Sequence, residues 1–169
     1  MRDYSKVSPA FWTRGSGKKL RGNAAAQVVA LYLATCPSSN MVGLYYVPLV
    51  TVAHETGLSV EAATEALAAT AKAGFAFFDT ENEIAWVPNM AEYQIGEQLK
   101  AGDKRRGMVL AQLDQAGDHP FVLEFWAKYQ GPYALGRCPV KGHRRGIEGA
   151  SCLETRTGRG ITFDIRSSG

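Results

Sequence analysis

The sequence predicts a mainly helical α+β fold. Three observations lead to this prediction: apolar residues recur at helical spacing through much of the chain, three short runs are rich in aromatic or β-branched residues, and glycine, proline or a capping residue separates these segments. Hydrophobic residues make up 46% of the 169 positions, which is enough for a buried core. No run approaches the length of a membrane span and the beginning has no apolar signal region, so we expect a cytoplasmic protein.

Residues 1–22 are predicted to form an extended basic arm. Pro9 and three glycines interrupt it, and six basic side chains stand against one acidic side chain. Phe11 and Trp12 are expected to hold the arm on the core, because large apolar groups gain free energy from burial. The charge of the arm suits contact with phosphate groups.

The next segment predicts two helices around a short strand. Asn23 is a good N-cap for a helix over 24–35. The aromatic and β-branched run 44–47 predicts a strand, and a second helix at about 49–55 would end at Gly57 in a left-handed conformation. The face of the first helix that we expect to be buried consists of Val28, Leu31, Tyr32 and Thr35.

A third helix and a hairpin complete this pattern. Ser59 caps an alanine-rich helix at about 60–73, which a glycine ends. The apolar runs 75–78 and 84–87 flank five polar residues without glycine, so they predict a hairpin whose turn type stays open. Helix, strand, helix, short turn, helix and hairpin follow one another in the order of a winged helix-turn-helix. We therefore predict a winged-helix domain at 23–100.

Additional helices are predicted on the C-terminal side of this domain. Asn89 is placed to cap a short helix. A helical extension at 101–130 follows, with helices at about 104–115, capped by Asp103, and at about 121–129. The apolar faces of these helices suit either oligomerisation or packing back on the core, and packing is the more common use.

Residues 131–169 are predicted to form a flexible Gly/Arg-rich tail. Cys138, His143 and Cys152 could supply three zinc ligands there, but their spacing fits no common zinc finger and a fourth ligand is not identified. We therefore expect no metal and no cofactor. The three cysteines are odd in number and widely spaced, so they do not indicate a disulfide framework.

Four stretches of the sequence carry a resemblance to a known family. They are Asp3–Pro9 with Phe11–Trp12, Gly43–Leu49, Ala53–Leu58 and Trp86–Ala91. These stretches resemble the N-terminal region of phage-encoded replication initiation proteins, the replisome organisers, which are similar to DnaD-like primosomal initiators. The resemblance covers about residues 1–130. It implies a winged helix, binding to double-stranded DNA near a replication origin, and self-association as a homo-oligomer.

The middle of the chain is acidic, which argues against the usual docking of a winged helix on DNA. Residues 23–99 carry one basic and eight acidic side chains. The helix at 60–73, which would enter the major groove, holds Glu61 and Glu65 and has no arginine, asparagine or glutamine. A carboxylate at contact distance from a phosphate is repelled by about 1 kcal/mol even in water.

Two functional hypotheses follow from this charge distribution. In the first, duplex DNA lies along basic side chains that neutralise phosphates without reading the base sequence. The candidate contacts are Lys18, Lys19, Arg21, Lys72, Lys104, Arg105, Arg106, Arg144 and Arg145. In the second, the protein is a non-enzymatic adaptor or inhibitor that binds a replication or host protein through an acidic face made of Glu61, Glu65, Glu81 and Glu83. The first is preferred, and a transcription regulator with a palindromic operator is a third interpretation.

The sequence offers no reaction centre, so we do not expect an enzyme. The run Gly15–Lys19 resembles a phosphate-binding loop but has Trp12 where that motif needs its first glycine, and a second lysine where it needs Ser or Thr. His119 is expected to be a helix-end residue rather than a catalytic base. Short basic runs are also common on solvated surfaces. The aromatic residues of the predicted hairpin could stack on bases, but packing against helices is expected for Phe75, Phe77, Phe78 and Trp86.

Overall fold

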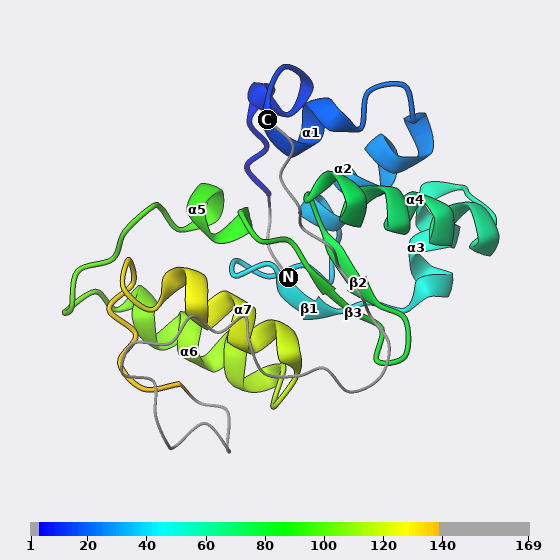
Figure 1. Ribbon diagram of the computed structural model, residues 1–169. Helices are drawn as coiled ribbons and strands as arrows, with labels where there is room; N and C mark the ends of the chain where they lie inside the picture. Colours follow the sequence, from blue (N-terminus) through cyan, green and yellow to red (C-terminus); the bar gives the residue numbers. More distant parts are fainter. Residues whose placement is uncertain (1–3, 139–169) are drawn as a thin grey trace.

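A computed structural model describes residues 4–138, and within them the fold is mainly helical α+β (Figure 1). In chain order the elements are a 3₁₀ turn η1 at Pro9–Trp12, α1 at Gly15–Lys19, α2 at Ala24–Thr35, β1 at Leu44–Tyr46, α3 at Leu49–Thr56, α4 at Val60–Ala73, β2 at Phe77–Asp79, β3 at Ile84–Trp86, α5 at Met90–Gln94, α6 at Arg105–Gln115 and α7 at Pro120–Tyr129. None of the helices in residues 4–138 has both the length and the apolar character needed to cross a membrane.

The predicted helix boundaries in the first half of the chain are confirmed. The Asn23 side chain accepts a hydrogen bond from the Ala26 N–H at 2.9 Å, and Ser59 does the same for Ala62 at 3.1 Å. Each bond satisfies one of the N–H groups that a helix leaves without a partner in its first turn. At the other end of α3, Gly57 takes a left-handed φ of 72°, which glycine adopts without steric cost.

The buried face of α2 differs from the predicted one. Ala26, Val29, Ala30 and Leu33 are fully buried, whereas Val28, assigned to the core from its spacing, is 44% exposed. Apolar side chains surround α2 on most sides, so helical periodicity alone does not single out a face. The contact with α4 decides the face, because alanines on both helices let the two backbones approach closely.

The three strands form one antiparallel sheet in the order β1-β3-β2. Leu44 lies opposite Trp86, and Trp86 lies opposite Phe77, so these three side chains form a row on one face. The neighbouring row of Tyr45, Ala85 and Phe78 points to the other face, because successive residues of a strand alternate. Both rows are apolar, so the sheet has a core on each side.

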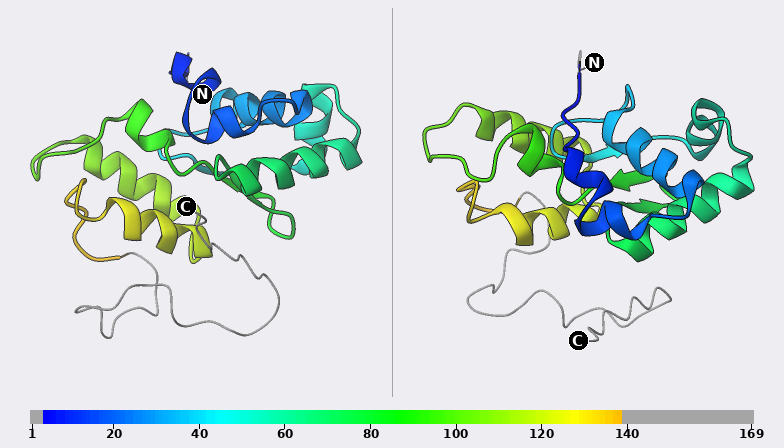
Figure 2. Two further views of the ribbon diagram at one scale, coloured as in Figure 1. Left: turned by 45° about the horizontal axis from the view of Figure 1, so that its top comes forward. Right: turned by 90° about the horizontal axis from the view of Figure 1, so that it is seen from above.

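The first core lies between one face of the sheet and the helices α2, α3 and α4, and the second lies between the other face and α6 and α7. Figure 2 shows the same arrangement from two other directions, and in its left view α6 and α7 (yellow-green and yellow) lie side by side, away from α2 and α4. The extra helices therefore pack back on the core, which confirms the favoured use of their apolar faces. Val109, Leu113, Val122 and Phe125 are fully buried there.

Residues 131–135, the beginning of the predicted tail, are held against this second core by two side chains. Tyr133 and Leu135 are buried, and the Leu99 N–H donates to the Pro132 carbonyl at 2.9 Å. The prediction of a flexible tail from residue 131 is therefore wrong for these five residues. The sequence in this stretch lacks helical periodicity, which led to the prediction of a flexible segment. A short irregular segment can still be fixed on a core when two of its large side chains are buried. The rest of the predicted tail, from residue 139, lies outside the described residues.

One of the predicted helix caps, Asn89, behaves differently from expectation. Asn89 makes no capping bond to α5, and its side-chain oxygen instead accepts from the Lys128 ammonium on α7. The Asp103 carboxylate accepts from the Arg105 N–H at 2.9 Å at the start of α6. At α7, the His119 ring nitrogen Nδ1 accepts from the Phe121 N–H at 3.2 Å, as expected for a helix-end residue.

The predicted extended arm is partly helical. The Ser8 side chain caps η1, Pro9 occupies the first turn, and α1 follows within a few residues. Gly17 allows α1 to pack on this turn, because a Cβ there would overlap the Phe11 carbonyl oxygen. Phe11 is buried as predicted, but Trp12 is 51% exposed and does not join the core.

Candidate nucleic-acid interface

The segment of residues 4–22 carries basic side chains and no acidic ones. All of its basic residues are exposed: Lys6, Arg14, Lys18, Lys19 and Arg21. The segment is held in place by contacts that do not involve the two lysines of α1. The ring of Phe11 meets the ring of Phe75 edge-on at 5.5 Å between centroids, and the Arg21 guanidinium donates to the Trp12 carbonyl at 2.9 Å.

The C-terminal end of α4 lies beside this basic segment. α1 and α4 are in contact, and Figure 1 shows α1 next to the helical layer that contains α2 and α4. Lys72 is exposed in the last turn of α4, three residues before the Phe75 ring that meets Phe11. The structure therefore brings Lys72 near the residues of the predicted arm.

The second predicted basic cluster, Lys104–Arg106, does not form a common phosphate site. The Arg105 guanidinium binds Asp103 at 2.7 Å and the Ile95 carbonyl at 2.8 Å. Hydrogen bonds from Arg105 lower the pKa of Asp103 to about 2. Arg106 donates to the carbonyls of Ala101 and Ala134, which holds two loops on α6. Lys104 is exposed at the beginning of α6, a helix that packs on the opposite face of the sheet from α2 and α4.

The acidic residues predicted on α4 lie on its exposed face. Glu61 and Glu65 are both exposed, and Val60 at the beginning of the helix is 41% exposed. A hydrogen bond from its own backbone N–H and one from the Ser59 hydroxyl lower the pKa of Glu61, so its carboxylate is ionised at neutral pH. This face is therefore negative where a phosphate would have to approach.

The two glutamates of the hairpin turn have different environments. Glu81 is exposed. Glu83 is instead engaged: its carboxylate accepts from the Leu49 N–H at 2.9 Å and from the Tyr46 hydroxyl at 2.8 Å. Glu83 thus caps α3 from a distant part of the chain, a role that sequence reasoning missed. The only local signal was that Pro48, the residue before α3, has no side chain able to cap.

The aromatic residues of the hairpin are used for packing. The rings of Phe77 and Trp86 stack at 5.6 Å between centroids, and Trp86 stacks on Phe121 of α7 at 5.6 Å. Phe78 packs against the first core. The preference for packing over base stacking is confirmed for these side chains.

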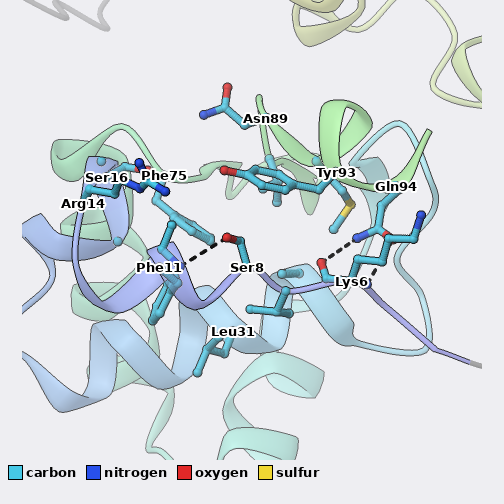
Figure 3. A pocket seen from close by; sticks show the side chains of 17 residues that line it. Lys6, Ser8, Phe11, Arg14, Ser16, Leu31, Phe75, Asn89, Tyr93 and Gln94 are labelled. Carbon is cyan, nitrogen blue, oxygen red and sulfur yellow. Dashed lines mark hydrogen bonds between the residues drawn. The ribbon is translucent and has the colours of Figure 1, made fainter. Parts of the chain in front are cut away.

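A cavity of about 260 Å³ lies between the predicted arm and the core, and sequence reasoning missed it (Figure 3). Its walls come from separate stretches of the chain: residues 6–17, α2, the segment after α4, and α5. Within the described part of the chain, the lining includes aromatic, aliphatic and amide side chains together with Lys6 and Arg14, and no carboxylate. Because these stretches are distant in sequence, no local pattern could have revealed the cavity.

The Gln94 side chain holds the backbone at Lys6, which forms one wall of this cavity. The Gln94 amide is buried, accepts from the Lys6 N–H at 3.2 Å and donates to the Lys6 carbonyl at 2.9 Å. Figure 3 shows this pair of bonds at one end of the pocket, with Arg14 and Ser16 at the other. The cavity is therefore framed by a fixed stretch of backbone.

The candidate zinc ligands lie mostly beyond the part of the chain that can be described. Cys138 is half-buried beside the second core, while His143 and Cys152 fall outside the described residues, as do Arg144 and Arg145. Within residues 4–138, no group of three His, Cys, Asp or Glu side chains is placed to hold a metal ion.

Comparison of the chain with family models, with curated proteins and with solved structures gives no match.

Proposed function

We propose that this chain is a non-enzymatic winged helix-turn-helix protein that holds duplex DNA by its phosphates, in a role like that of phage replication initiation proteins. The observation that carries the proposal is the segment of residues 4–22, with its five exposed basic side chains and no acidic one. Such a surface attracts phosphate by releasing condensed counterions, and it needs no particular base sequence.

In this proposal α3 and α4 are the helix-turn-helix and the β2–β3 hairpin is the wing. The short turn Gly57–Ser59 between two helices, followed directly by a hairpin, supports this assignment. α4 does not enter the major groove, because Glu61 and Glu65 would be brought against phosphates. The DNA instead lies along α1 and the end of α4, where Lys18, Lys19 and Lys72 are exposed.

The test is a titration of labelled duplex DNA with the full chain at several salt concentrations. We expect the logarithm of the binding constant to fall linearly with the logarithm of the salt concentration. Lys18→Ala/Lys19→Ala is expected to weaken binding and to reduce the slope by about 0.9 for each phosphate that the variant no longer neutralises. Both lysines are exposed, and within residues 4–138 neither side chain forms a hydrogen bond or ion pair, so the variant should melt like the wild type.

Lys100→Ala/Lys104→Ala is the matched control, since it removes two exposed charges outside the basic segment, just before α6. It is expected to keep the wild-type slope. Equal slopes for all three proteins would remove α1 from the proposed interface, and a complete lack of binding at low salt would end the DNA-binding proposal.

The acidic face of α4 favours a second candidate function, an adaptor or inhibitor that binds a basic surface of another protein. Glu61, Glu65 and the exposed Val60 lie together at the beginning of the helix. The variant Glu61→Gln/Glu65→Gln, tested in the same DNA titration, shows whether this face of α4 lies against DNA or is left for a protein partner. Little change in DNA affinity leaves the face available to a protein partner, whereas a large gain means that α4 itself lies against DNA.

A further inference from the structure

The cavity adjoins the surface along which we place DNA. Gly15, Ser16 and Gly17 line it, and Lys18 and Lys19 follow directly on the same helix. Tyr93 lines the cavity and is 51% exposed, so the cavity is in contact with solvent. A group attached to a strand along α1 could therefore reach it without a rearrangement of the core.

The lining has the chemistry of a nucleotide site. Phe11, Phe75 and Tyr93 supply aromatic surface, and Leu31 and Met90 supply aliphatic surface. Bases of every kind stack on such surfaces, because each base has a π-face. Figure 3 shows the Tyr93 ring reaching across the pocket, with its hydroxyl directed to the side where other polar groups lie.

The polar groups of the cavity suit an anion. Arg14 and Ser16 stand together at one end, and a guanidinium with a hydroxyl is a common partner set for a phosphate. Among residues 4–138 no carboxylate lines the cavity, although the chain between residues 23 and 99 carries eight. A negatively charged ligand would therefore not be repelled at short range.

The size of the cavity limits its occupant. Its volume of about 260 Å³ lies below the range of roughly 300–1,000 Å³ typical of pockets for drug-sized ligands, so the occupant is no larger than about one nucleotide. A base within an intact duplex is stacked and paired, and it would have to be extruded at a cost before it could enter. An unpaired base carries no such cost.

We propose that this cavity receives one unpaired nucleotide of a DNA strand, with its base among the aromatic side chains and its phosphate at Arg14 and Ser16. This inference rests on the proposed binding of DNA along α1. If the cavity holds an unpaired nucleotide, the preferred ligand of the protein is a junction between single-stranded and double-stranded DNA rather than uninterrupted duplex.

The experiment compares two labelled DNAs at the same low salt: a blunt duplex, and the same duplex extended by a short single-stranded overhang with 2-aminopurine as its first unpaired base. The wild type is expected to bind the overhang DNA about fivefold more tightly or better, which is the lower end of the effect of stacking one base. A change in 2-aminopurine fluorescence should accompany binding.

Two variants test the cavity by different means. Tyr93→Ala removes an exposed aromatic side chain from the lining. Ala34→Leu places a larger side chain in the lining and so reduces the space in the cavity. Both are expected to abolish the preference for the overhang and the fluorescence change. Tyr4→Ala is the control, since Tyr4 is 75% exposed and does not line the cavity. It is expected to behave like the wild type.

The outcomes separate this inference from the proposed function. If the wild type binds both DNAs equally, or if the preference survives Tyr93→Ala and Ala34→Leu, the cavity is not a nucleotide site although DNA binding stands. If the wild type binds neither DNA, both proposals fall. Because Tyr93 is exposed, its variant provides a result even if Ala34→Leu does not fold.

Discussion

Glu83 combines an unusual backbone with two hydrogen bonds that reach other elements. Its φ of 52° is in the left-handed region, which is uncommon for residues other than glycine. In this conformation its carboxylate reaches the Leu49 N–H at the beginning of α3 and the Tyr46 hydroxyl on β1. The bonds of Glu83 thus compensate for its backbone conformation and join the hairpin to α3.

We expect Glu83→Ala to lower the free energy of unfolding by about 1–2 kcal/mol, the usual effect of losing a side chain that caps a helix. Urea denaturation measures this change, provided that the slope with denaturant is the same for both proteins. Glu81→Ala is the matched control at an exposed position of the same turn, and it should stay within about 0.5 kcal/mol of the wild type. Equal effects of the two substitutions would contradict the capping role.

At the scale of single elements, the glycines of α1 and α6 have different surroundings. Gly17 in α1 faces the Phe11 backbone at a distance that leaves no space for a side chain. Gly107 lies inside α6, where it is exposed and a Cβ would meet no neighbouring atom within 4 Å. Packing therefore requires only the first glycine, although both occupy helical positions.

Replacing each glycine by alanine is expected to have opposite effects. Gly107→Ala should raise the free energy of unfolding by about 0.5–1 kcal/mol, because glycine loses more conformational freedom in a helix. Gly17→Ala should lower it, because α1 must move away from the Phe11 carbonyl. Thermal melting of the two variants checks both signs, and stabilisation by Gly17→Ala would show that α1 does not pack in this way.

Across the whole molecule, Asp79 and His119 join the hairpin to the C-terminal helices. Asp79 accepts from the N–H groups of Glu81 and Asn82 at 2.9 and 3.3 Å, which fixes a turn that has no glycine. The same carboxylate lies 3.0 Å from Nε2 of His119 at the start of α7. Because Nδ1 of His119 accepts from Phe121, Nε2 is the nitrogen that donates to Asp79.

The pKa of Asp79 predicts a response to acid. Partial burial raises this pKa, but hydrogen bonds from Asn82, His119 and the backbone outweigh burial and hold the pKa at about 2. A carboxyl whose pKa is lowered by folding stabilises the protein above its unfolded pKa of roughly 3.9, and this contribution is lost as the pH falls toward the folded value. Stability should therefore decrease between about pH 4 and pH 2.

Asp79→Asn should reduce the stability at neutral pH and flatten its decrease in acid. Denaturant titrations at a series of pH values between about 2 and 7 measure this difference. Asp114→Asn, at an exposed position of α6, is the control and should follow the wild-type pH dependence. An unchanged acid response in Asp79→Asn would mean that this carboxylate does not connect the hairpin to α7.

Much of the fold could be predicted because its signals are local. The side chains of Asn23 and Ser59 accept hydrogen bonds from N–H groups three residues further along the chain. Gly57 ends α3 because its own backbone is left-handed. These interactions depend on residue type and short spacing, so the sequence states them directly. The basic character of residues 4–22 is equally a property of the sequence, and so is the acidity of α4.

The features that the sequence did not predict depend on which distant segments of the chain come into contact. The buried face of α2 was decided by its contact with α4, Arg106 was drawn into holding loops, and Gln94 reaches Lys6 across 88 positions to hold one wall of a cavity. By itself the sequence determined the helices between residues 24 and 73, their ends and the distribution of charge, because caps and turns act over a few residues. Only the tertiary structure decided which side chains stay exposed and where a cavity forms, because burial results from packing between segments far apart in the chain.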